Sequence, residues 1–106
     1  MHYRFMRVIL FFDLPMITNE ELKAYRKFTK FLKKDGFIML QKSVYTKLVL
    51  NHTKVKSIIS TVNKNLPKDG LISILVVTEK QFANITHLLG DHTSNVLCSD
   101  ERLVEL

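Results

Sequence analysis

The chain has 106 residues, enough for one domain with its own core but too few for a second. Lys and Arg number 16 against 10 for Asp and Glu, and the formal net charge of +6 indicates an acidic partner, with nucleic acid the leading candidate. A hydrophobic content of 46% excludes a disordered tail, and the single cysteine, Cys98, cannot form a disulfide within the chain. We therefore expect one cytoplasmic domain over residues 1–106.

The first third of the chain predicts a strand followed by a helix. Residues 7–13 are a continuous apolar, β-branched and aromatic run, which predicts a strand buried on both faces at the centre of a sheet. The apolar part, residues 8–12, is too short for a signal peptide or a membrane span. Thr18 and Glu21 have the spacing of a capping box, after which apolar side chains recur at helical spacing. Gly36 is expected to end this helix.

The middle of the chain predicts three more strands and a second helix. Residues 37–50 are rich in β-formers but interrupted by polar residues, so two short strands joined by a kink or bulge are expected. Residues 55–66 have apolar side chains at helical spacing, and Pro67 ends that helix. Residues 71–77 predict another buried strand. The order β-α-ββ-α-β is that of the ferredoxin-like fold, an α+β architecture with two helices on one face of an antiparallel sheet.

The C-terminal part of the sequence adds elements that this minimal fold does not contain. Residues 78–82 predict a short capped helical turn, and residues 85–89 and 103–106 are typical of short edge strands. An extra apolar strand at the end of a small domain is suited to pairing with the exposed edge of another chain. We expect residues 85–106 to serve dimer formation or contact with a partner.

Three segments of the sequence are similar to one known family. They are Ile9-Leu-Phe-Phe-Asp-Leu-Pro15, Gly36-Phe-Ile-Met-Leu-Gln-Lys-Ser-Val-Tyr45 and Val77-Thr-Glu-Lys-Gln-Phe82. In this order, and in a chain of this length, they resemble the small CRISPR-associated adaptation proteins of the Cas2 family, in the form that accompanies type II systems. The resemblance covers most of the chain.

The resemblance implies a ferredoxin-like homodimer that bridges two dimers of the CRISPR integrase and binds double-stranded prespacer DNA during spacer acquisition. It also implies a metal-dependent endonuclease activity, on single-stranded RNA or on DNA depending on the member, in which Asp13 is the catalytic residue and metal ligand. A binding scaffold is the preferred interpretation, with the integration chemistry belonging to the integrase. A magnesium-dependent endonuclease is the alternative, and no membrane partner is expected.

Asp13 has two interpretations that the sequence leaves open. Mg²⁺ takes oxygen ligands in octahedral geometry, and one carboxylate alone holds it weakly. A two-fold axis near the end of the first strand would bring Asp13 of a second copy to the same ion. Alternatively, Asp13 only ends the strand and bonds the turn before Thr18, as aspartate often does.

Basic side chains favour binding to a nucleic-acid backbone. They neutralise phosphates and release counterions, which produces a salt-sensitive affinity that does not depend on base sequence. The alternatives are a solvated helix face and a ligand-sensing or protein-interaction domain whose charge is incidental. The candidates lie on the exposed side of the first helix and in the strand region after it: Lys23, Arg26, Lys27, Lys30, Lys42 and Lys47.

The sequence contains no motif for a zinc site or a nucleotide-binding loop, and it does not favour a base-stacking platform. The histidines have no accompanying cysteine pairs that would make a zinc set, and no Walker loop or Gly-x-Gly-x-x-Gly motif is present. A base-stacking platform is not favoured, because the phenylalanines fit core positions. These are Phe11, Phe12, Phe28, Phe31 and Phe37.

Overall fold

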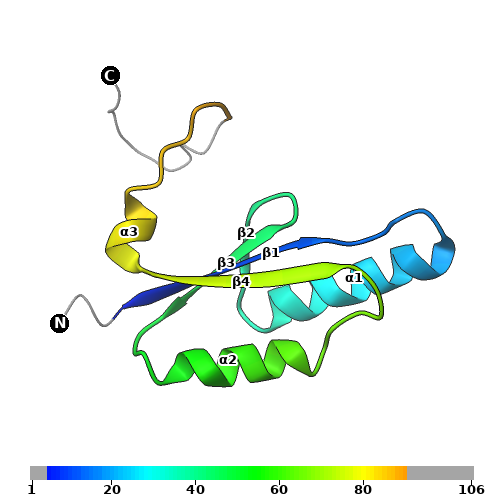
Figure 1. The fold of residues 1–106 in the computed structure, drawn as a ribbon, viewed down its shortest axis with the longest axis horizontal. Helices are drawn as coiled ribbons and strands as arrows, with labels where there is room; N and C mark the ends of the chain where they lie inside the picture. Colours follow the sequence, from blue (N-terminus) through cyan, green and yellow to red (C-terminus); the bar gives the residue numbers. More distant parts are fainter. Residues whose placement is uncertain (1–4, 91–106) are drawn as a thin grey trace.

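The structure is a computed structural model and describes residues 5–90. Its elements are β1 (Met6–Asp13), α1 (Asn19–Lys34), β2 (Ile38–Gln41), β3 (Val44–Val49), α2 (Lys54–Asn63), β4 (Leu71–Thr78) and α3 (Glu79–Ala83). The strands form one antiparallel sheet in the order β2-β3-β1-β4. Helices α1 and α2 lie on one side of the sheet, and α3 stands at its end on the other side (Figure 1). The expected ferredoxin-like architecture is confirmed.

The core lies between the sheet and the helices α1 and α2. Side chains alternate along β1, so that Met6, Val8, Leu10 and Phe12 are buried on the helix side. The ring of Phe12 meets that of Phe28 of α1 edge to face, with 5.5 Å between the centroids. Each such side chain stabilises the fold by about 1.5–3 kcal/mol when it leaves water. β1 is therefore the central strand, as expected.

Within residues 5–90, most of the opposite face of the sheet is uncovered, although Thr46 on it is buried. Ile9, Phe11 and Asp13 point away from the helices, and Phe11 is 43% exposed. β4 is an edge strand in which Leu71 and Leu75 are 71% and 53% exposed. The expectation that residues 7–13 are buried on both faces, with Phe11 in the core, is wrong for residues 5–90 of a single copy, and β4 is only partly buried. Helices α1 and α2 cover one side of the sheet, and only the short α3 lies on the other, at one end (Figure 1).

Helix α1 begins with the expected capping box. The Thr18 hydroxyl accepts from the Glu21 amide at 3.1 Å, and Oε1 of Glu21 accepts from the amides of Thr18 and Ile17 at 3.0 and 2.9 Å. These amides favour the charged carboxylate and lower the pKa of Glu21 from its ordinary value. The helix ends at Lys34, and Gly36 follows with a φ of 98°, which glycine adopts without strain.

The capping box makes stability depend on pH. Because the folded-state pKa of Glu21 is lowered, its charge stabilises the fold above the unfolded-state pKa, and this contribution is lost as the pH falls through the folded-state value. We expect the midpoint of thermal unfolding to fall more steeply on acidification in wild type than in Glu21→Gln. The control is Glu20→Gln, which removes a neighbouring exposed carboxylate and should follow wild type. Equal slopes for wild type and Glu21→Gln would contradict this assignment.

Residues 37–50 fold as a tight hairpin rather than as a kinked pair of strands. Lys42 and Ser43 reverse the chain between β2 and β3, and Ser43 has a φ of 67°. The register shifts between Met39 and Gln41, so an irregularity of the bulge type lies within β2 and not at the junction of the two strands, where it was expected. Two-residue hairpin turns usually contain Gly or Asn at a positive φ. Because Ser43 takes that place here, the sequence contains no recognisable turn motif.

Two boundaries differ from the expectation. Helix α2 ends at Asn63 and not near Pro67, because the side chain of Asn65 donates to the Thr61 carbonyl at 2.8 Å and competes with further helical bonding. In this single copy residues 85–89 do not form a strand, so the edge strand expected there for pairing with another chain stays a prediction; residues 103–106 lie outside the described part. Helix α3 has the expected capping box. No helix within residues 5–90 is long and apolar enough to cross a membrane.

Candidate nucleic-acid interface

The outward side of α1 is a continuous basic surface, called here the basic face. Phe28 and Leu32 pack toward the sheet, so side chains on the other side of the helix point to solvent. All the cations there are exposed, and none has an ion-pair partner within residues 5–90. The basic face consists of Lys23, Arg26, Lys27, Lys30, Lys33 and Lys34.

The basic face can bind phosphates along a backbone. Its helix has 16 residues and is about 24 Å long at roughly 1.5 Å per residue. This length spans several phosphates of one strand. Like charges three and four residues apart repel each other and slightly destabilise a helix, so a bound polyanion would relieve that repulsion.

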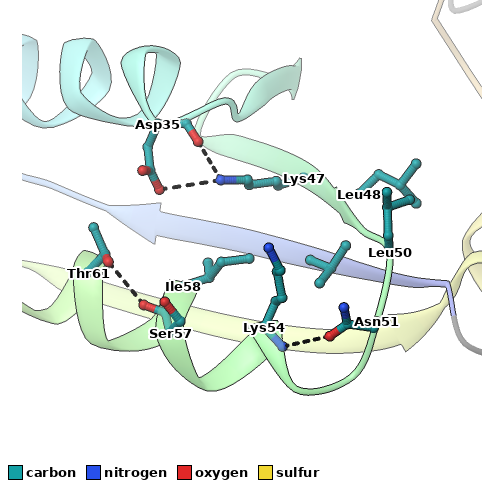
Figure 2. A pocket seen from close by; sticks show the side chains of 10 residues that line it. Asp35, Lys47, Leu48, Leu50, Asn51, Lys54, Ser57, Ile58 and Thr61 are labelled. Carbon is teal, nitrogen blue, oxygen red and sulfur yellow. Dashed lines mark hydrogen bonds and ion pairs between the residues drawn. The ribbon is translucent and has the colours of Figure 1, made fainter.

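The remaining two predicted cations have different surroundings. Lys42 is exposed in the turn between β2 and β3. Lys47 pairs with Val8 in register and so lies on the helix side of the sheet. Its Nζ donates to the Asp35 carbonyl at 2.5 Å and lies 3.7 Å from the Asp35 carboxylate, beside a hollow of about 500 Å³ (Figure 2). Lys47 thus neutralises the negative end of α1, and it has a partner that the cations of the basic face lack.

The uncovered side of the sheet is called here the open face. Its two central rows carry no charge, while Asp13 lies at one end and Arg7 at the other. The strand register arranges the open face in four rows: Leu48, Arg7 and Val77; Ile38, Thr46, Ile9 and Leu75; Gln41, Val44, Phe11 and Ser73; and Asp13 with Leu71.

Arg7 holds α3 to its end of the open face. Its Nε and Nη2 donate to the two carboxylate oxygens of Glu79 at 2.8 and 2.7 Å, and its guanidinium carbon lies 4.4 Å from the centroid of the Phe82 ring. The Glu79 amide also donates to the Phe5 carbonyl at 3.0 Å. Sequence reasoning missed this cluster, whose only local signal is the i, i+3 spacing of Glu79 and Phe82 on one side of a short helix.

Asp13 is exposed at the other end of the open face. It pairs with Leu71 in register, and its carbonyl lies close to Gly70. Its carboxylate makes no hydrogen bond within residues 5–90, so these residues give no support to the interpretation that it bonds the turn before Thr18.

Comparison with known proteins shows to which family this chain belongs. The family model described as CRISPR associated protein Cas2 matches residues 6–85, a range that contains every strand and helix described above. The chain belongs to the Cas2 family. The resemblance indicated by the three sequence segments is thereby confirmed.

Curated members of the Cas2 family are similar over nearly the whole chain. A Treponema denticola protein named CRISPR-associated endoribonuclease Cas2 is 54% identical over 101 residues, which are 95% of this chain and 100% of that protein. A protein of the same name from Streptococcus mutans serotype c is 52% identical over 95% of this chain and 93% of its own length. A third, from Ligilactobacillus salivarius, is 41% identical over 95% of this chain and 100% of its own length.

A single copy of this Cas2-family chain does not fit a magnesium ion. Within residues 5–90, no group of three or more His, Cys, Asp or Glu side chains is placed to hold a metal. Asp13 is the only acidic side chain in the rows of the open face. One exposed carboxylate is a weak ligand set for Mg²⁺, so any metal site at Asp13 requires further ligands from outside residues 5–90 of one copy.

Proposed function

We propose that this Cas2-family chain works as a two-fold dimer that binds double-stranded DNA by its backbone during CRISPR spacer acquisition. It acts as a scaffold that bridges two dimers of the CRISPR integrase, and the integration chemistry belongs to the integrase. The observation that carries this proposal is the basic face of α1, whose cations are exposed and have no ion-pair partner within residues 5–90. Such a surface binds phosphates whatever the base sequence.

A second copy of the chain is the proposed cover of the open face. β1 is apolar from Val8 to Phe12, and β4 is apolar except for Ser73 and Thr78, which is typical of strands buried on both sides. Yet α1 and α2 cover only one side, and α3 lies at one end of the other (Figure 1). Because the central rows carry no charge, two copies can meet there in an isologous contact without like-charge repulsion. β4 also presents an edge of eight residues without charge or proline, which monomeric proteins generally avoid. Residues 85–106 are the proposed source of a strand for pairing within the dimer or with the integrase.

An endonuclease is the second candidate function. It is favoured by the names of the relatives, which are endoribonucleases, and by the exposed position of Asp13 at one end of the open face. In the proposed dimer, two copies of Asp13 would supply the carboxylates for Mg²⁺, which polarises a phosphate and activates water when bound. The substrate would be single-stranded RNA or DNA.

Asp13→Ala tests the scaffold. We expect this variant to keep duplex binding and integrase-dependent spacer integration at the level of wild type, because a scaffold requires the basic face and the dimer but no carboxylate at this position. Asp69→Ala is the matched control, since Asp69 is an exposed carboxylate in the loop before β4. Loss of integration in Asp13→Ala alone, with dimer and duplex binding intact, would refute a role restricted to scaffolding.

The same variant tests the endonuclease. Metal-dependent cleavage of single-stranded RNA by purified wild type, abolished in Asp13→Ala and kept in Asp69→Ala, would establish an enzyme. Cleavage that survives Asp13→Ala would exclude Asp13 as the catalytic residue.

A further inference from the structure

We propose that Arg7, acting through Glu79 and Phe82, is a positioning residue that sets how two copies align on their open faces. The alignment that it imposes brings both Asp13 carboxylates into the interface. This inference rests on the proposed dimer and adds to it the device that selects one alignment.

Arg7 fastens helix α3 on the open-face side, in addition to the bond from the Glu79 amide to the Phe5 carbonyl. Met6 and Val8 point into the core, so the side chain of Arg7 between them points to the open face. There it meets both oxygens of Glu79 and the ring of Phe82, and only 15% of the Arg7 side chain is exposed. Figure 1 shows α3 on the side of the strands away from α1 and α2. These contacts, called here the Arg7 clamp, hold α3 over one end of the open face.

The clamped helix occupies space that a second sheet would need. Two sheets packed face to face lie about 10 Å apart. An α-helix with its side chains is about 10–12 Å across, so α3 fills that layer at the Arg7 end. Arg7 and Asp13 lie roughly 20 Å apart along β1 at about 3.3 Å per residue. A second copy can therefore cover only the part from Ile9 to Asp13, and two-fold symmetry applies the same limit to both copies.

If α3 did not block the Arg7 end of the open face, two effects would move the copies toward that end and away from contact between their Asp13 side chains. Sliding toward the Arg7 end would bury the additional apolar side chains of Leu48 and Val77, which favours association. It would also separate the two Asp13 carboxylates, whose like charges repel. Neither effect holds the two carboxylates within one interface, so the alignment depends on α3 and on the Arg7 clamp that keeps it in place.

Crosslinking between copies measures this alignment directly. The combination Cys98→Ser with Asp13→Cys leaves one thiol per copy, and a short bismaleimide should join the two thiols of a dimer in high yield. Adding Arg7→Met or Glu79→Gln should lower that yield several-fold, while the dimer mass from light scattering and the thermal unfolding midpoint stay near those of the parent. The exchanged pair Arg7→Glu with Glu79→Arg should recover part of the yield, because the ion pair forms again. Lys80→Met, which removes an exposed cation of α3 outside the clamp, should change nothing.

Each other outcome counts against the proposal. An unchanged yield in both clamp variants would overturn it and leave the proposed dimer intact. An equal loss in Lys80→Met would show general loosening of α3 rather than a role of Arg7. A fall in dimer mass caused by the clamp variants would assign the cluster to association and not to alignment. No dimer in any variant would overturn this proposal together with the proposed function.

Discussion

The double reversal Lys27→Glu with Lys30→Glu is expected to weaken duplex-DNA binding by about 10- to 100-fold at moderate salt. Both side chains belong to the basic face and lack ion-pair partners within residues 5–90. With two phosphate contacts fewer, binding also releases fewer counterions. The slope of log affinity against log salt should therefore flatten by about 2 for each bound copy. Titration of a fluorescent duplex at several salt concentrations measures both quantities.

A matched pair of substitutions in and just after α2 distinguishes the effect of the basic face from the effect of net charge. Lys56→Glu with Lys64→Glu changes the charge equally at two other exposed lysines, one within α2 and one just after it. Equal weakening by the two pairs would contradict a specific role of α1. Unfolding is not expected to explain the loss in the α1 pair. The glutamate at position 27 would face Lys23, and the one at position 30 would face Arg26, Lys33 and Lys34, three or four residues away, while the repulsion between positions 27 and 30 only changes its sign of charge.

Gly70→Ala is expected to lower the free energy of unfolding by roughly 2–4 kcal/mol. Gly70 has a φ of 113°, which side chains rarely adopt, and an added Cβ would lie 2.5 Å from Cδ2 of Leu14 and 2.9 Å from the Asp13 carbonyl oxygen. The second collision is with backbone and cannot be relieved by a rotamer change. The substitution should therefore also displace the strand end that carries Asp13.

Gly36→Ala is the control for this steric effect. Its φ of 98° is also positive, but the added Cβ would meet only the flexible Lys47 side chain, with Cε at 3.4 Å. Strain alone is expected there, about 1 kcal/mol. Urea unfolding of both variants measures the difference, and equal losses would show that the contacts around Gly70 relax freely.

Local features of the fold could be predicted from the sequence because their causes are local. The capping boxes at Thr18 and Thr78 and the glycine after α1 involve residues within a few positions of each other. Periodicity predicted both main helices, and the apolar runs predicted β1 and β4. The order of the elements is that of the ferredoxin-like sheet, and the spacing of the lysines in α1 predicted the basic face.

The remaining features depend on which distant residues become neighbours. An apolar run indicates that a strand can be buried on both faces, but only the packed sheet decides that, among residues 5–90, most of one face of β1 and β4 lacks a cover. Register decides that Lys47 turns toward Asp35, while the lysines of α1 have no ion-pair partner in the part of the chain that the structure describes. Arg7 and Glu79 are 72 positions apart, and no sequence spacing could pair them. The sequence by itself therefore determined the elements, their order and the charge of α1. The tertiary structure alone decided which charges are paired and which face is open, because both follow from contacts between strands far apart in the chain.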